Sequence, residues 1–547
     1  MAGGRDFGGS ARQSEVVVDQ LGVGMSKELS RRGALVAGLA AGATVGLAGH
    51  ASAAVSAETV TRKGIAFTHA TVIDATGARA QPDMTVVVED DRIVSLGRFQ
   101  DVRVPPGVRK VDLRGKYLIP GLCDMHVHSG SDRIEPALYV ANGVTTVREM
   151  SGDPRFADWL RRIDDGTLTG PRWYVGSRVI DGSPSPWDPA LVPVIIVKTE
   201  AEARAAVRLV KSEGADFVKV YTRLSREVLR AVADESRRQG LAFVGHCPDM
   251  VPLTEAVDLG QRSFEHLFGI FYANSRKEAE LLAKLEKLKL TDGDYNSWFT
   301  AMHPVEREAA LTQSPVKARA LYAKLAARQA RQVPTLILNH VLDNARAIPR
   351  DNPLRKYLPK DTVEFNDFIR DEFYLKNRTP QLDAEWAEMF HHRLDLVGEM
   401  HRAGVPIMAG TDTGTPEVYP GFALHEELGH LVSAGLSPMN ALQAATSEPA
   451  RFLGTERDTG TIARGKIADL VVLNANPLDD IRNTTKIDSV VLRGRYIPSD
   501  ERTRMLADVE KAAAETPPGA AVAAGCACHS PVSRSGGYSS RIVSVYS

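Results

Sequence analysis

The chain has 547 residues, a formal net charge of −1 at pH 7, 43% hydrophobic residues and 25% charged residues. This length can bury a large core and allows one large domain with a smaller one. The near-neutral charge gives no electrostatic reason to expect nucleic acid or an anionic membrane as a partner. The four cysteines show no legible disulfide framework; they are Cys123, Cys247, Cys526 and Cys528.

Residues 1–57 are predicted to be an N-terminal extension that carries an export signal. The pair Arg31-Arg32 precedes the weakly apolar run GALVAGLAAGATVGLAGHASAA, a layout typical of secretory signals, and the pair itself indicates the twin-arginine type. The alternative is an apolar helix that anchors the chain or joins the fold, but the run is too weakly hydrophobic to favour a stable span. We therefore expect a periplasmic or secreted protein, without a stable membrane span after signal removal, and a cytoplasmic one if the signal interpretation is wrong.

Short strands are predicted near both ends of the folded part. FTHATVIDATG and DMTVVVEDDRIVSLG lie within residues 58–117, and GKIADLVVLN and IDSVVLRG lie within residues 456–498. Polar turns separate these runs, as in small β structures. The two groups flank a long middle section, so we expect one small β-sandwich domain built from both chain ends.

Residues 118–455 alternate between apolar strand candidates and helical stretches, among them Glu200–Glu213, Ser225–Gln239 and Ala384–Ala403. Such alternation predicts an α/β fold, namely a (β/α)8 TIM-like barrel with its active site at the carboxyl ends of the strands. The alternative, a doubly wound sheet, lacks a Gly-rich phosphate loop after the first strand. The eight candidates are Lys116–His128, Gly143–Arg148, Arg172–Ile180, Asp216–Tyr221, Leu241–His246, Ser263–His266, Val333–Asn339 and Val405–Asp412.

Two stretches interrupt this alternation, at about residues 270–332 and 341–383. Their charged helices are typical of solvated faces, although long insertions on barrel loops can also form lids or specificity walls. Residues 499–547 are predicted to form a C-terminal helix and a disordered tail that is rich in Ala, Gly and Ser from about Pro517. The short tract CACH in this tail could catch a metal, but it is interpreted as inert.

The stretch CDMHVHSG places His126 and His128 one residue apart where an apolar strand ends. Residues i and i+2 of a strand point to the same face, so the two imidazoles converge and could bind a metal. Either one could instead be a core histidine satisfied by hydrogen bonds. Further polar residues lie at or near other predicted strand ends, and together they predict a metal site at one rim of the barrel; they are Lys219, His246, His266 and Asp412.

PGLCDMHVH, together with Lys219, His246, His266 and the stretch GTDTG, resembles the amidohydrolase superfamily, in particular its imidazolonepropionase-like and prolidase-like members. The resemblance extends from about residue 60 to about residue 498 and includes the segment ARGKIADLVVL. It implies two divalent metal ions, with zinc the expected metal, and a carbon dioxide adduct on the lysine that bridges them. The implied ligands are His126, His128, Lys219 and Asp412 for the first ion, and Lys219, His246 and His266 for the second.

The resemblance also implies roles in catalysis. Burial of Lys219 among Phe217, Val218 and Val220 favours the neutral amine, which can take up carbon dioxide. Asp412 would accept a proton from the nucleophile and pass it to the leaving amine. Tyr221 would bind the substrate carbonyl or oxyanion, although a packing role is also open.

Substrate contacts are less clear from the sequence. His340 could reach substrate, but no motif defines its role, and His425 and His430 are interpreted as structural. The chain reads VREMS where family members often have VRDMG, which leaves the substrate contacts of that loop open.

We interpret the chain as a metal-dependent amidohydrolase that cleaves a C–N bond by metal-activated hydroxide, most closely a prolidase-like enzyme acting on dipeptides or N-acyl amino acids. The alternatives are a cyclic amide or imidazolone hydrolase and a non-catalytic binding barrel. A mononuclear deaminase is disfavoured because Lys219 lies at the bridging position. The expected partner is a small-molecule amide or dipeptide, and a homo-oligomer is possible. The preferred side chain and the native metal are left open.

Overall fold

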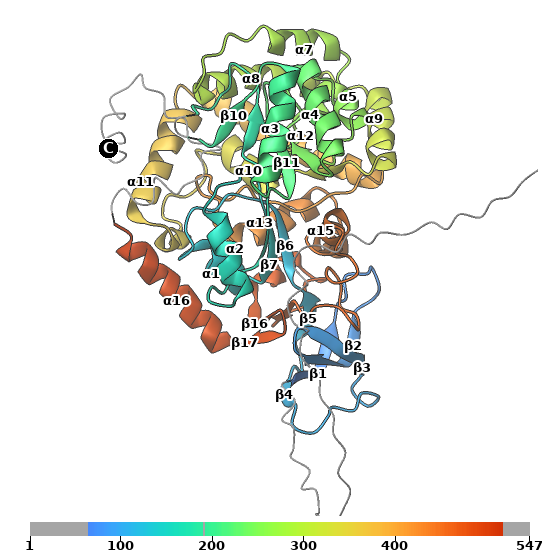
Figure 1. Cartoon of the computed structure of the whole chain (residues 1–547). Coiled ribbons are helices and arrows are strands. Elements are labelled where there is room, and N and C mark those ends of the chain that lie inside the picture. Colours follow the sequence, from blue (N-terminus) through green and yellow to red (C-terminus); the bar gives the residue numbers. More distant parts are fainter. Residues whose placement is uncertain (1–63, 190–191, 518–547) are drawn as a thin grey trace, which may run out of the picture. The chain divides into compact units, whose positions relative to one another are not determined.

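The computed structural model describes residues 64–189 and 192–517 (Figure 1). The predicted export signal with Arg31 and Arg32 lies outside the described residues, as do Cys526, Cys528 and most of the predicted tail. The predictions for these segments therefore stay predictions.

Strands from both ends of the described chain share one eight-stranded mixed sheet. Its order is β17-β16-β15-β5-β1-β2-β3, and β4 pairs with β1. β5 pairs antiparallel with β15, which joins residues more than three hundred positions apart, such as Val471 and Ile119. Phe67, Val86 and Val491 contribute to its apolar core. The strands are β1 Gly64–Val72, β2 Gln81–Glu89, β3 Arg92–Arg98, β4 Arg109–Asp112, β5 Tyr117–Pro120, β15 Leu470–Leu473, β16 Ile487–Leu492 and β17 Arg495–Ile497. The pairing unites the two predicted strand groups, while the sandwich form and the domain boundaries stay predictions.

The middle of the chain forms two parallel sheets. One has the order β6-β7-β8 and the other the order β10-β9-β11-β12-β13-β14. Several of these strands are buried along their whole length, as is typical of parallel sheets covered on both faces. Their bounds are β6 Leu122–Val127, β7 Val144–Glu149, β8 Arg172–Val175, β9 Val179–Asp181, β10 Val194–Ile196, β11 Phe217–Val220, β12 Ala242–Gly245, β13 Ser263–Glu265 and β14 Arg331–Val333. The alternating α/β class with parallel strands is therefore as predicted.

Parallel bridges connect these two sheets at two places. Gly176, after β8, pairs with Phe217 of β11. At the other place, residues 406–413 lie between β14 and β6: Ile407 pairs with Gln332, and Thr413 pairs with Val127. These bridges bring the carboxyl ends of β6, β11, β12 and β13 and residue 412 to one end of the strands.

Four predicted strands differ from the observed ones. The predicted strand Val405–Asp412 is no named strand among the described residues and pairs with its neighbours only through isolated bridges. The predicted strand Val333–Asn339 is wrong, because β14 ends at Val333 and Leu336–Asp343 forms helix α10. Pro334 has no N–H to donate to a sheet, and Thr335 has a φ of +45°, so the strand stops there. The predicted strand Lys116–His128 is two strands that separate at Gly121 and belong to different sheets, and Arg172–Ile180 is divided into β8 and β9.

Helices cover the parallel strands and make up most of both insertions (Figure 1). The predicted helices at Glu200–Glu213, Ser225–Gln239 and Ala384–Ala403 correspond to α3, α4 and α12. The helices between β6 and β14 are α1 Glu135–Ala141, α2 Phe156–Asp164, α3 Glu200–Ser212, α4 Arg226–Arg238, α5 Leu253–Asp258, α6 Ile270–Asn274, α7 Glu278–Glu286, α8 Tyr295–Leu311 and α9 Pro315–Ala327. Those after β14 are α10 Leu336–Asp343, the turns η1 Pro353–Tyr357 and η2 Arg370–Tyr374, α11 Lys360–Ile369, α12 Pro380–Arg402, α13 Phe422–Ser433, α14 Pro438–Ala444, α15 Ser447–Leu453, η3 Ile481–Thr485 and α16 Ser499–Glu515.

None of the helices within the described residues combines the length and the apolar character that crossing a membrane requires.

Helix α13 carries a buried carboxyl group that makes the stability of the fold depend on pH. Glu427 is fully buried, and its Oε2 accepts a hydrogen bond of 2.8 Å from the backbone N–H of Ile337 in α10. Burial raises the pKa of Glu427 from 4.5 to about 8. The stability contributed by its neutral form is therefore complete below pH 4.5 and is lost as the pH rises through about 8.

We predict that Glu427→Gln, which cannot ionise, gains stability relative to the wild type as the pH is raised from 5 to 8. Chemical denaturation of both proteins across this range measures the difference in the free energy of unfolding. Parallel pH profiles for the two proteins would contradict the assignment.

Candidate active site

Three imidazoles surround one carboxylate at the ends of the parallel strands. Oδ1 of Asp412 lies 3.3 Å from Nε2 of His126 and 3.1 Å from Nε2 of His128. Oδ2 of Asp412 lies 3.8 Å from Nε2 of His266. All four side chains are buried. The structure therefore brings together residues that are up to 286 positions apart and that the sequence singled out as ligands.

The other predicted site residues lie beside this cluster. The ring of His246 is 5.0 Å from the ring of His266 and 4.1 Å from the ring of Tyr221. Burial, and then the nearby Lys219 amine, hold the pKa of His246 well below its ordinary value, so this imidazole is neutral at pH 7. Lys219, on β11, is itself only 1% exposed.

Gly245 allows β12 to pass close to Lys219 and Val220 of β11. A Cβ atom at position 245 would lie 2.1 Å from the backbone oxygen of Val220 and 3.1 Å from Cδ of Lys219. The φ of Gly245 is +128°, which side chains rarely tolerate. A glycine is therefore needed where β11 and β12 run together beside the site.

A buried ion pair orients His126. Oε2 of Glu265 lies 2.9 Å from Nδ1 of His126, and Nη2 of Arg148 donates to both oxygens of the same carboxylate at 2.9 Å. Burial opposes ionisation of Glu265, but the Arg148 guanidinium holds the pKa of this carboxyl well below its usual range. Because the carboxylate is ionised, Nδ1 of His126 must donate the hydrogen bond, and a neutral ring then keeps its lone pair on Nε2, the atom that faces Asp412.

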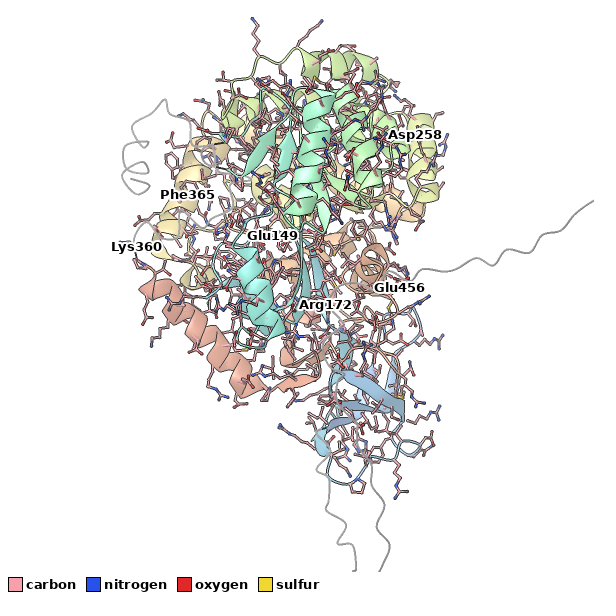
Figure 2. The ribbon with its side chains drawn as sticks, in the orientation of Figure 1. Glu149, Arg172, Asp258, Lys360, Phe365 and Glu456 are labelled. Atoms are coloured by element: carbon pink, nitrogen blue, oxygen red, sulfur yellow. The ribbon has the colours of Figure 1, made fainter. Side chains whose placement is uncertain are left out.

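Two further residues lie beside the Nδ1 atoms of candidate ligand imidazoles. Oε1 of Glu149, labelled in Figure 2, lies 3.5 Å from Nδ1 of His128. Oγ1 of Thr335 lies 2.8 Å from Nδ1 of His266. Carboxylates and hydroxyls in such positions set the orientation of metal-binding histidines. None of Glu149, Thr335 and Glu265 was predicted as a site residue: Glu149 was noted only as part of VREMS, and the other two belong to no motif that the sequence analysis singled out.

The backbone is strained where the site residues lie. Asp412, His266 and Thr335 have φ values of +62°, +59° and +45°, in the left-handed region that non-glycine residues seldom occupy. Such strain costs on the order of 1–3 kcal/mol per residue and clusters at functional sites. Asp124 helps to hold this geometry, since its carboxylate accepts hydrogen bonds from the backbone N–H and the hydroxyl of Thr411 at 3.1 and 2.6 Å.

The donor set fits a divalent metal ion. Ligand atoms of His126, His266 and Asp412 lie within 4.8 Å of one another. Imidazole nitrogens and a carboxylate oxygen are ligands that zinc-like ions prefer. Nδ1 of His246 is buried and has no hydrogen-bond partner among the described residues, so it is available as a further donor.

His340 packs against other aromatic rings, and burial makes the Cys123 thiol unreactive. The ring of His340, on α10, packs against Phe390 and His430 at 5.0 and 4.9 Å, and its contact with substrate stays a prediction. Burial raises the pKa of the Cys123 thiol to about 12, which keeps it protonated and unreactive at neutral pH.

A cavity of about 300 Å³ opens onto His128. This volume is within the range of small-molecule sites. Four segments line it: residues 130–135 after β6, residues 358–366 of the second insertion, residues 414–420 after Asp412, and residues 516–517 after α16. A second, much smaller space of about 30 Å³ lies at His246 and His266 and is lined by residues of α8, α10 and α12. The second insertion therefore forms part of a pocket wall.

Comparisons with known proteins identify a matching family, similar sequences and similar structures. The model of the Amidohydrolase family matches residues 117–497. Ochratoxinase from Aspergillus niger is 23% identical over 439 residues, which cover 68% of this chain and 72% of that protein. Among solved structures, a putative prolidase from Bifidobacterium longum is 25% identical with a TM-score of 0.57, covering 82% of this chain and 99% of that one. Bottromycin amidohydrolase is 22% identical with a TM-score of 0.65, covering 85% and 93%.

Thr335 offers a direct test of this arrangement. Thr335→Val keeps the shape and the β-branched backbone preference of the side chain but removes the hydroxyl that contacts Nδ1 of His266. We predict a loss of about 10–100-fold in metal affinity or activity, as is usual when such a partner is removed. Competition with a chelator measures the affinity, and Thr335→Ser, which keeps the hydroxyl, serves as the control. Wild-type affinity and activity in the valine variant would show that Thr335 does not orient His266.

Proposed function

Because the chain belongs to the amidohydrolase family and is a hydrolase, we propose that it cleaves the C–N amide bond of dipeptides or N-acyl amino acids with two divalent metal ions. The observation that carries this proposal is the convergence of His126, His128 and His266 on the Asp412 carboxylate. Burying three imidazoles and a carboxylate costs free energy unless their polar atoms have partners, and bound metal ions would supply such partners.

A closed barrel is part of this proposal. The bridges from Gly176 to Phe217, from Gln332 to Ile407 and from Val127 to Thr413 support it. Together with the sheet pairings, they link β6, β7, β8, β11, β12, β13, β14 and residues 407–413 in a ring. In a closed barrel the ends of separate strands converge on one site. Residue 412 can then reach β6, although it is 286 positions away from His126.

The proposed metal ligands are those that the sequence indicated. One ion would be held by His126, His128 and Asp412, and the other by His246 and His266. A carboxylated Lys219 would bind both ions. The burial of Lys219 and its proximity to His246 support this assignment, since an ammonium group beside two cations would be repelled. When bound, the ions lower the pKa of water and polarise the scissile carbonyl.

The residues of the chain itself supply proton transfer and orientation. Asp412 would accept a proton from the attacking water and deliver it to the leaving amine, because its carboxylate lies at the centre of the cluster. Tyr221 would donate a hydrogen bond to the carbonyl oxygen. Its ring lies 4.1 Å from that of His246, which supports a position beside the reacting group.

The choice of substrate rests on the relatives and on the cavity. The relatives and structural neighbours of the chain include a putative prolidase, ochratoxinase and bottromycin amidohydrolase. The cavity of about 300 Å³ beside His128 is large enough for a dipeptide-sized group. A hydrolysis screen over dipeptides, N-acyl amino acids and cyclic amides tests this choice. Turnover of cyclic amides alone would favour the imidazolone-type alternative, and no turnover by metal-loaded protein would refute the proposed function.

Asp412→Asn tests the proton carrier. The amide keeps a ligand-shaped oxygen but cannot accept the proton, so metal should largely remain while turnover falls by about 10²–10⁴. Elemental analysis and kcat measured on the same preparation separate loss of metal from loss of catalysis. Near wild-type turnover in a metal-replete variant would remove Asp412 from the mechanism.

Lys219 tests the bridging carbamate. We predict about two ions per chain in the wild type and loss of metal and activity in Lys219→Ala, with partial recovery when acetate or propionate is added with metal. Lys219→Arg should fail as well, because guanidinium stays charged and cannot take up carbon dioxide. An arginine variant that keeps both metals and full turnover would show that the carbamate assignment is wrong.

A further inference from the structure

The C-terminal helix α16 lies beyond the residues that match the family model, which end at position 497. It follows β17 of the mixed sheet, and Figure 1 shows it alongside α1. Nε of Arg502 donates to the backbone oxygen of Ala141 at 2.6 Å, which fixes the helix to the end of α1. The family match therefore does not account for what this helix does.

One face of α16 packs against the walls of the cavity beside His128. Val509, Ala512 and Ala513 form an apolar cluster with Ile134 and Leu138 of the β6–α1 region and with Tyr357 of η1. Ile134 itself lines the cavity, as do Leu358 and Pro359 directly after η1. The packing of α16 therefore sets the position of two of the four segments that form the cavity.

The end of α16 also lines the cavity directly. Thr516 and Pro517 are among the lining residues, and Oγ1 of Thr516 donates to the backbone oxygen of Ala512 at 2.8 Å. Oε2 of Glu515, one residue earlier, lies 3.6 Å from Nη2 of Arg133 in the β6–α1 loop. The helix thus reaches the same space that opens onto a proposed metal ligand.

The charged groups that line this cavity all have partners. Asp132 accepts a hydrogen bond from Arg162, Arg133 lies near Glu515, and Glu135 accepts a hydrogen bond from the backbone N–H of Ser131 at 2.7 Å. The other lining side chains are apolar or neutral, among them Ile134, Leu358 and Val418. Among the described residues these charges are already paired, although Arg133 and Glu515 are 58% and 52% exposed. A charged substituent would therefore lose water here for little gain, whereas an apolar one would gain by burial.

We infer that α16 is a wall of the substrate pocket, and that this pocket accepts an uncharged, apolar substituent on one side of the scissile amide. This inference rests on the proposed function and makes it more specific. The helix is a positioning element, since it acts through the pocket walls and touches none of the reacting groups.

Ala513 and Ala514 offer a matched pair of variants. Ala513 is 2% exposed and faces the apolar cluster, whereas Ala514 is exposed on the same turn. Ala513→Asp should displace α16 from Ile134 and Tyr357, because an unpaired carboxylate cannot be buried there. Ala514→Asp makes the same chemical change at the surface and serves as the control.

Two substrate series give the readout. One compares benzyloxycarbonyl-, succinyl- and formyl-glycine, and the other compares acetyl-phenylalanine, acetyl-glutamate and acetyl-alanine. In at least one series, the wild type should prefer the apolar member over the charged one. Ala513→Asp should raise KM for that apolar member by about tenfold, a typical effect of altered contacts in a hydrophobic pocket. Metal content should stay as in the wild type, and kcat/KM should change less for the smallest member than for the apolar one.

Thr516→Trp keeps the inference testable if Ala513→Asp does not fold. It narrows the cavity from the α16 side, so kcat/KM should fall by a larger factor for the apolar member than for the smallest one. Equal use of charged and apolar members by the wild type, or unchanged kinetics in both variants, would overturn the inference.

A separate measurement distinguishes failure of this inference from failure of the proposed function. If metal-loaded wild type hydrolyses no member, the proposed function is refuted, and the pocket is then tested by calorimetric binding of benzyloxycarbonyl-glycine and acetyl-phenylalanine. Binding that is weakened by Ala513→Asp but not by Ala514→Asp would support the pocket. Absence of binding, or equal binding by all three proteins, would overturn it.

Discussion

The site depends on one buried ion pair, between Arg148 at the end of β7 and Glu265 at the end of β13. Glu265 also accepts the hydrogen bond from His126, and Arg148 donates to the backbone oxygen of Met125 at 2.6 Å. Removing one partner of such a pair costs about 3–5 kcal/mol, because the other charge stays buried alone. These contacts link β6, β7 and β13 at the candidate ligand His126. The tautomer of His126 then follows from the charge of Glu265.

The strand ends next to this pair carry the strain of the site. Asp412, His266 and Thr335 adopt left-handed backbone conformations, and Gly245 provides the close approach between β11 and β12. These conformations persist because the surrounding parallel strands are buried on both faces and leave little room for relaxation. A rigid scaffold of this kind can hold several ligands from distant parts of the chain within a few ångströms.

The cavity beside His128 is built differently from the cluster of buried ligand candidates. The loops after β6 and after Asp412, the second insertion and the end of α16 meet around the cavity beside His128. Loops and added segments of this kind vary more readily than strands, so specificity can change while the ligand cluster stays the same. The relatives and structural neighbours of this chain carry names as different as ochratoxinase and bottromycin amidohydrolase, which agrees with a division between a shared fold and variable loops.

The sequence alone determined the parallel α/β class and the ligand candidates, because alternation in a strand places His126 and His128 on one face and because polar residues stand out where apolar runs end. It did not predict Glu265 and Thr335, since the importance of each lies in a contact with a histidine 139 or 69 positions away. The apolar run after Val333 was predicted as a strand, but Pro334 and the left-handed Thr335 end the strand, and the run packs as helix α10. Only the tertiary structure decided which polar groups meet and which segments enclose the cavity beside His128, because both depend on strand register and helix packing between distant segments rather than on local pattern.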